Sequence, residues 1–286
     1  MRAGFLAFLM LLLGVAPAHA DRFTLRYDGF GLGFIPVGGV VIDANVGDDY
    51  YEVTTNLESR GIFNLFERTN IQASASGVIE DGRVAWRRYD LDHHYARKHR
   101  IIHMEADRSG VTATINPNFR LWGNPPASPQ QKRISRDPLS TIIAMAVDIS
   151  HNQHCAGQYP TFDGRFHYVM SLSGNGSRRN YRGGGYNGPV LECDLTYAAV
   201  SGFEATDNGR RRITQGHIVF ALGDPSFAPP VRISTPLSAG GAVIRLNSWR
   251  RVDVQIEDQA TPAGLEAAPD DGADTTSTPA PTSAPQ

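Results

Sequence analysis

The feature that most constrains this chain is a long succession of short segments in which apolar and polar residues alternate. Turn pairs such as Asp81-Gly82 and Asp163-Gly164 separate neighbouring segments, which favours tight antiparallel hairpins. The alternating segments are residues 23–27, 37–44, 50–57, 70–79, 83–91, 97–106, 111–115, 158–162, 165–172, 190–200, 212–222, 231–235, 242–246 and 251–256. We therefore expect a mainly β protein, with one long twisted antiparallel sheet closed or spiralled into a barrel-like body.

One segment has the period of a helix instead. Asp137 is a good N-cap residue and Pro138 suits the first helical position. Apolar residues then recur at spacings of three and four up to Ile149. We expect an α-helix over residues 138–149 with its apolar face packed against the sheet. The Pro-rich stretch before it, residues 116–136, is long enough to be a lid or a mobile arm.

Both ends of the chain differ in composition from the rest. Residues 5–15 form an apolar run that is too short to span a bilayer, and Ala18-His19-Ala20 fits the small-x-small pattern of a cleavage site. Residues 259–286 are rich in Pro, Thr, Ser, Ala and Asp and lack aromatic residues. We expect a signal peptide at 1–20, a single β-rich domain at 21–258 and a disordered tail at 259–286. Export places the mature chain in the periplasm, not spanning the membrane.

Cys155 and Cys193 are the two cysteines of the chain. Two cysteines in an exported protein most often pair, and no C-x-x-C motif suggests redox chemistry. We expect a disulfide, which in the chain-entropy model would stabilise the fold by roughly 4 kcal/mol.

Four histidines cluster around the turn between the alternating segments 83–91 and 97–106: His93, His94, His99 and His103. His99 and His103 share one face of a strand, and His93 or His94 across the turn offers a third ligand. The metal-site hypothesis is therefore His93, His99 and His103. It competes with a plain solvated surface, because the basic residues Arg97, Lys98 and Arg100 would repel a cation.

A glycine-rich stretch, residues 174–188, offers the other binding hypothesis. We expect it to be a loop, and its arginine and tyrosine side chains suit an anionic envelope component: Arg178, Arg179, Tyr181, Arg182 and Tyr186. Gly183, Gly185 and Gly188 match the spacing of a dinucleotide fingerprint, but a proline and a strand follow where a helix is needed. A solvated hairpin tip is the alternative.

Other classes of function receive no support. The net charge of -2 gives no strong field for nucleic acid. No G-x-S-x-G or S-x-x-K motif occurs, so we expect neither catalytic residues nor a cofactor. An outer-membrane barrel is disfavoured because charged residues such as Arg87, Arg88 and Asp90 occupy both faces of a strand.

Several stretches in order resemble a DUF-type family of proteobacterial periplasmic proteins of unknown function. They are Tyr27 with 33–38, the run Asp137-Pro138-Leu139-Ser140, Cys155 with 162–165, Cys193 with 200–203, and 230–232 with 245–246. The resemblance implies a monomeric β-rich envelope protein with a cysteine pair and no known activity. By fold analogy alone, the chain is also similar to periplasmic proteins that coil one sheet into a spiral and support the envelope.

These observations favour a non-enzymatic periplasmic protein that supports the cell envelope. We expect it to bind a lipid-like or anionic envelope component, or a periplasmic partner protein. One alternative is a protein-interaction or structural module without a ligand. The other is a His-dependent metalloenzyme or hydrolase.

Overall fold

A computed structural model of the chain describes residues 19–61, 68–205, 214–237 and 240–255. The predicted tail, 259–286, and most of the predicted signal segment lie outside these ranges. The strands described are β1 (His19–Gly31), β2 (Ile35–Gly47), β3 (Tyr50–Ser59), β4 (Thr69–Glu80), β5 (Arg83–Tyr95), β6 (Lys98–Asp107), β7 (Gly110–Asn116), β8 (Gly157–Phe162), β9 (His167–Gly183), β10 (Tyr186–Ser201), β11 (Gln215–Ala221), β12 (Pro230–Leu237) and β13 (Gly240–Gln255). The helices are α2 (Pro129–Ile134) and α3 (Pro138–Asn152).

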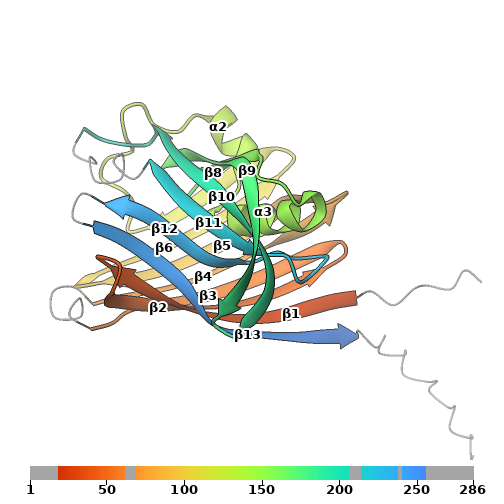
Figure 1. The fold of residues 1–286 in the computed structure, drawn as a ribbon. Coiled ribbons are helices and arrows are strands. Elements are labelled where there is room, and N and C mark those ends of the chain that lie inside the picture. The colour runs from red at the N-terminus through yellow and green to blue at the C-terminus, as the bar shows by residue number, and fades with distance from the viewer. Residues whose placement is uncertain (1–18, 62–67, 206–213, 238–239, 256–286) are drawn as a thin grey trace, which may run out of the picture. The chain divides into compact units, whose positions relative to one another are not determined.

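The strands form one antiparallel sheet, in the order β7-β6-β5-β4-β3-β2-β1-β13-β12-β11-β10-β9-β8. Most neighbours are joined by short turns, whereas β1 pairs with β13 from the other end of the domain, with Phe23 opposite Arg251. The sheet curls round upon itself (Figure 1). Its edge strands, β7 and β8, do not pair with each other, so the ladder is not strictly closed. The predicted class, a single coiled antiparallel sheet, is confirmed.

The segment expected to be a lid contains α2 and joins the two parts of the sheet. Ser128 caps α2 through a capping box with Gln131. Beyond α2, the indole Nε1 of Trp86 in β5 donates to the Ser135 carbonyl oxygen at 2.8 Å. Arg136 in turn exchanges backbone hydrogen bonds with β8, through the Pro160 carbonyl and the Phe162 amide. The segment is therefore tied to strands on both sides of the gap between β7 and β8.

Helix α3 lies inside the curve of the sheet (Figure 1), as its apolar stripe predicts. It begins at Pro138 with Asp137 as N-cap and extends to Asn152, three residues beyond the predicted end. The Tyr51 hydroxyl of β3 donates to Ser140 Oγ at 2.6 Å, and the Ala228 amide donates to the Ala146 carbonyl at 3.1 Å. Strand β3 and the segment between β11 and β12 thus both hold the helix, and its apolar residues complete the core.

The disulfide between Cys155 and Cys193 is confirmed. It joins the segment just after α3 to strand β10, with the two Cα atoms 5.4 Å apart. Both side chains are buried in the core. The bond therefore links the helix that fills the sheet to the sheet itself. Neither helix in the described part of the chain is long and apolar enough to cross a membrane.

The glycine-rich stretch is a correction to the sequence prediction, because it is not a loop. Strands β9 and β10 continue through it as a long hairpin that turns at Gly184 and Gly185. Both glycines have positive φ, and a Cβ at Gly184 would overlap the carbonyl oxygen of Leu246 in β13. The glycines mark a tight turn packed against another strand rather than mobility.

Candidate functional site

The inner face of the curled sheet is apolar along its length, but only part of it is filled. Near α3 the side chains pack tightly, and large residues such as Phe23, Tyr51 and Phe220 are fully buried. Towards the other end the inner residues of β9 to β12, among them Met170, Leu195 and Ile233, are only partly buried. The sequence pattern that makes the core therefore continues into a region that the helix does not occupy.

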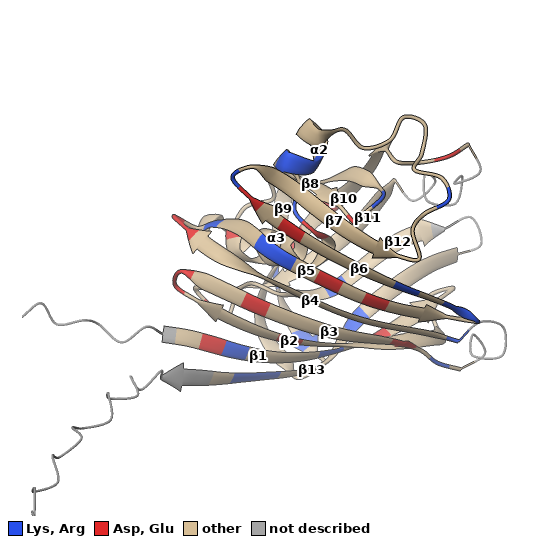
Figure 2. Ribbon diagram, turned by 180° about the vertical axis from the view of Figure 1, so that it is seen from behind, with Lys and Arg blue, Asp and Glu red and all other residues tan. Residues whose placement is uncertain are grey.

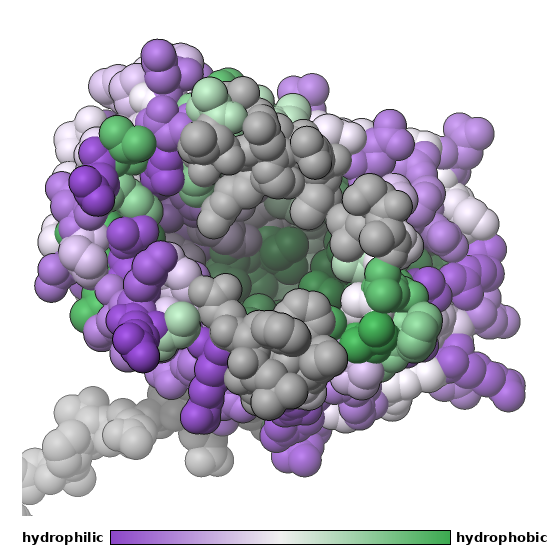
Figure 3. Space-filling view, turned by 90° about the vertical axis from the view of Figure 1, so that its left-hand side faces the viewer, coloured by the Kyte–Doolittle hydropathy of each residue, from purple (hydrophilic) through white to green (hydrophobic). Residues whose placement is uncertain are grey.

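A hollow of about 400 Å³ lies over these partly buried residues. It is lined by Asp163, Phe166, Tyr168, Met170, Leu195, Tyr197, Gln215, Gly216, Ile233, Ser234 and Thr235. Figure 3 looks into the sheet from its open end and shows that the floor is hydrophobic, whereas much of the surrounding surface is hydrophilic. The volume is within the range of about 300 to 1,000 Å³ typical of small-molecule sites.

A few polar groups stand among the apolar ones. The rings of Tyr168 and Tyr197 lie with centroids 4.9 Å apart on neighbouring strands. Burial, together with the nearby Asp163 carboxylate, holds the pKa of the Tyr168 phenol well above 10.0. The Tyr168 hydroxyl therefore stays protonated at neutral pH and can donate a hydrogen bond to a bound molecule.

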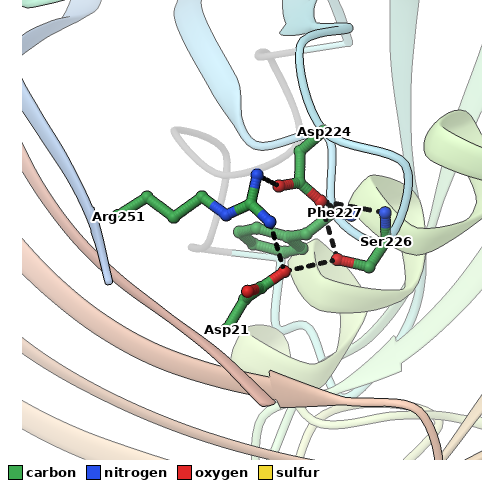
Figure 4. Close-up of polar contacts among 5 residues, drawn as sticks. All are labelled: Asp21, Asp224, Ser226, Phe227 and Arg251. Carbon is green, nitrogen blue, oxygen red and sulfur yellow. Dashed lines mark hydrogen bonds and ion pairs between the residues drawn. The ribbon is translucent and has the colours of Figure 1, made fainter. Parts of the chain in front are cut away.

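Polar contacts beside α3 join β1 to the segment between β11 and β12 (Figure 4). The buried Asp224 carboxylate accepts from the Ser226 and Phe227 amides and pairs with Arg251 at 2.6 Å. Arg251 also pairs with Asp21 at 3.0 Å, and Phe23 packs on Phe227 with centroids 5.0 Å apart. These contacts hold the chain's first and last strands to the segment that covers the helix, so we assign them a structural role.

The structure places the five residues proposed for anion binding along the β9–β10 hairpin. Arg178 donates to the Gln153 carbonyl at the end of α3, and Arg179 pairs with Glu192 at 3.3 Å. Tyr186 is buried against Trp249, whereas Tyr181 and Arg182 remain at least partly exposed. The five side chains do not converge on one point, and two of the arginines already have protein partners.

The structure also divides the three histidines of the metal hypothesis. His93 is directed away from the other two and stacks on Tyr95, with centroids 4.9 Å apart. The Nδ1 atom of His103 lies 2.6 Å from Asp90 Oδ1, and the hydrogen bond between them raises the pKa of His103 from its ordinary value of 6.5. His99 instead meets Asp92 and His94, the other histidine considered across the turn.

Sequence reasoning did not single out the residues that line the hollow. Tyr168, Met170 and Leu195 look like ordinary core positions of alternating strands. The Asp21–Arg251 contact was equally hidden, because its partners are 230 positions apart. The sequence did hold one signal of the hollow. The apolar inner face of the strands is longer than a single helix of 15 residues can cover.

Comparison with known proteins shows a likeness to a solved structure. No model of a known protein family matches the chain, and no curated protein matches it. A solved structure described as a β-barrel-like protein of the domain of unknown function DUF1849, from Brucella abortus, aligns with a TM-score of 0.47 and 9% sequence identity. The alignment covers 84% of this chain and 100% of that one.

Proposed function

We propose that this chain is a non-enzymatic periplasmic protein that supports the cell envelope by holding a lipid-like molecule within its curled sheet. The observation that carries the proposal is the hollow of about 400 Å³, whose walls include Phe166, Met170, Leu195 and Ile233. A concave, mostly apolar site with a few polar groups is the usual setting for a small apolar ligand. The buried disulfide is in keeping with an oxidising compartment such as the periplasm.

The form of the hollow favours an amphipathic ligand over a compact polar one. Aliphatic side chains contribute the contact area, and each buried methylene of a ligand would gain about 0.8 kcal/mol. The protonated hydroxyl of Tyr168 and the Asp163 carboxylate provide a donor and an acceptor in the wall. An acyl chain with a small hydrogen-bonding headgroup fits both features. Binding of an anionic polymer by the β9–β10 hairpin is less favoured, because Arg178 and Arg179 are already engaged.

The test is binding of a fluorescent long-chain fatty acid to the purified protein. Leu195 projects into the hollow from β10, so Leu195→Trp should fill part of it and weaken binding at least about tenfold, or 1.4 kcal/mol. The matched control is Val200→Trp on the same strand, where the side chain is exposed. We expect the control to bind like the wild type and both variants to remain folded by circular dichroism.

Saturable binding that Leu195→Trp leaves unchanged would place the ligand elsewhere on the protein. No binding of the fatty acid, together with no lipid in the mass spectrum of protein purified from the envelope, would remove the proposal.

A function through protein contact is the second candidate. The β1–β2 hairpin carries two exposed apolar side chains, Leu32 at 46% and Phe34 at 74% exposure. Exposed apolar residues at a hairpin tip suit contact with a partner protein. Crosslinking in intact cells from position 34 would separate the two candidates, because a lipid carrier without a partner gives no specific protein adduct.

A further inference from the structure

Three side chains at the β5–β6 hairpin converge on one point of the outer surface of the sheet. The Nε2 atoms of His94 and His99 lie 2.9 Å and 2.8 Å from the same oxygen, Asp92 Oδ1. The two imidazole rings are stacked, with centroids 3.8 Å apart. One ligand atom from each of the three residues lies within 4.8 Å of the others. This cluster, Asp92/His94/His99, has no part in the hollow proposed above.

The register of the hairpin builds this arrangement. His94 is directly opposite His99 in the antiparallel ladder, and Asp92 precedes His94 by two residues. Because side chains alternate between faces, all three project from the same side of the sheet. His93, one residue earlier, is paired with Arg100 and projects from the opposite face.

The same alternation directs two basic side chains, Lys98 and Arg100, away from the cluster. The sequence had suggested that they would repel a cation. Lys98 Nζ lies 5.0 Å from the centre of the Tyr95 ring, which stacks on His93. The Arg100 guanidinium lies 4.0 Å from the Phe119 ring, and its Nε donates to the Pro117 carbonyl. Both side chains therefore belong to the opposite face from the cluster. On the cluster's own face the nearby strand residues include the acidic Asp90 and Glu105, which both contact His103. Glu105 also pairs with Arg88 on this face, at 3.2 Å. Figure 2 shows acidic residues interspersed with basic ones along the strands of this part of the sheet.

We propose that Asp92, His94 and His99 bind a first-row divalent transition metal, with Zn²⁺ the first choice. Two imidazole nitrogens and one carboxylate oxygen are a ligand set that zinc accepts, at about 2.0 to 2.2 Å from each atom. The ion would take the place of the close contacts between the carboxylate oxygen and the two ring nitrogens. Small rotations of the side chains bring the ligand atoms to the separation of about 3.3 Å that tetrahedral coordination requires.

The surroundings leave the remaining coordination position accessible. The side chains of His94, His99 and Asp92 are 55%, 46% and 44% exposed. Asp92 also lines a groove of about 440 Å³ that crosses strands β2 to β6 on the outer surface, with Asp43, Asn56, Gln72 and Asp90 among its walls. An ion bound by Asp92 would therefore lie beside a polar groove, with at least one position open to water or to a small polar ligand.

The experiment is calorimetric titration of the metal-stripped, untagged protein with Zn²⁺ alone. We expect one site with a dissociation constant in the micromolar range, on the order of 1 to 100 µM for three exposed ligands. His99→Ala and Asp92→Asn should each weaken binding at least about tenfold, or 1.4 kcal/mol. Binding should also weaken at acid pH, because metal ligands must be deprotonated.

The matched control is His217→Ala. His217 also pairs with one aspartate, Asp194, at 3.0 Å on an exposed surface, but it has no second histidine beside it. We expect His217→Ala to bind zinc like the wild type. Saturable binding that all three variants retain would place zinc elsewhere, and no saturable binding at about 1 mM zinc would overturn the site. Because Asp92, His94 and His99 do not line the hollow, fatty-acid binding should be the same in these variants whichever result is obtained.

Discussion

At the scale of single residues, Asp224 is a carboxylate that the fold buries together with its counter-charge. Its side chain is 1% exposed and pairs with Arg251 at 2.6 Å, while Asp21 contacts the same arginine from β1. Removing one partner of a buried ion pair leaves a charge in a medium that solvates it poorly. Arg251 therefore supplies the counter-charge for Asp224 within the fold.

We predict that Arg251→Met lowers the free energy of unfolding by about 2 to 3 kcal/mol. The estimate lies below that for a fully buried pair because the Arg251 side chain is 36% exposed and partly screened by water. Urea unfolding followed by circular dichroism measures the change. Arg250→Met, at an exposed neighbouring position, should cost less than about 0.5 kcal/mol. Equal effects of the two substitutions would show that the pair contributes little to the fold.

At the scale of elements, the start of α3 depends on the buried N-cap Asp137. Its Oδ1 accepts from the Leu139 and Ser140 amides at 2.9 Å, and its Oδ2 accepts from the Ser140 hydroxyl. Burial raises the pKa of Asp137 from 3.8 to about 6, although these hydrogen bonds oppose the rise. The folded state therefore binds a proton more tightly than the unfolded state does, so protonation of Asp137 favours folding.

The direction of this pKa shift predicts how the stability of the fold changes with pH. Asp137 adds stability as the pH falls from above 6 towards 3.8, and this contribution is complete below the unfolded pKa. Asp137→Asn keeps an acceptor for the two amides but cannot titrate. We predict that wild type gains about 2 kcal/mol relative to Asp137→Asn between about pH 7.5 and pH 4.5. Urea unfolding at the two pH values measures the gain. Parallel pH profiles for the two proteins would contradict the shifted pKa.

The same helix shows which elements can be predicted from sequence. Asp137, Pro138 and the apolar stripe are local signals, and the helix begins where they place it. The β9–β10 hairpin lacked such signals, because glycines at 174–188 are also typical of a loop. What makes the stretch a pair of strands is its packing: the turn meets Leu246 and Trp249 of β13, far along the chain. Local propensity could not reveal that contact.

At the scale of the whole sheet, the alternation of apolar and polar residues predicts an inner face. It does not predict how much of that face is covered by other side chains. The period-two pattern identifies the apolar side of β9 and β10, yet Leu172 is buried and Met170 is only partly buried. Which inner residues are covered depends on the position of α3 within the curl and on long-range pairs such as β1 with β13. Such long-range pairing depends on the assembled fold, so the hollow could not be derived from the chain alone. The grouping of the histidines could not be derived for a simpler reason, since the pairing register of β5 and β6 decides whether His93 or His94 lies beside His99.

The disulfide acts at this largest scale, because it fixes the position of α3 relative to the sheet. It closes a loop of 38 positions that contains β8, all of β9 and the first part of β10. Cross-linking a loop of this length reduces the entropy of the unfolded chain, which in the chain-entropy model corresponds to roughly 4 kcal/mol of stability. We predict that the Cys155→Ala/Cys193→Ala protein is less stable by about 3 to 4 kcal/mol in urea unfolding, with cavity formation offsetting little because both changes are small.

Loss of the disulfide should also increase local opening near the bond, which loss of an ordinary core contact would not do. Gly176, in β9, lies beside the sulfur of Cys155, and Arg178 binds the carbonyl of Gln153 at the end of α3. Without the cross-link we expect amide exchange to rise first in residues 149–157 and 174–182, while β2 to β4 keep their protection. Uniform acceleration across the sheet would mean that the bond acts only through global stability. Protection lost mainly at the end of α3 would show that it holds the helix in place and so preserves the hollow beyond it.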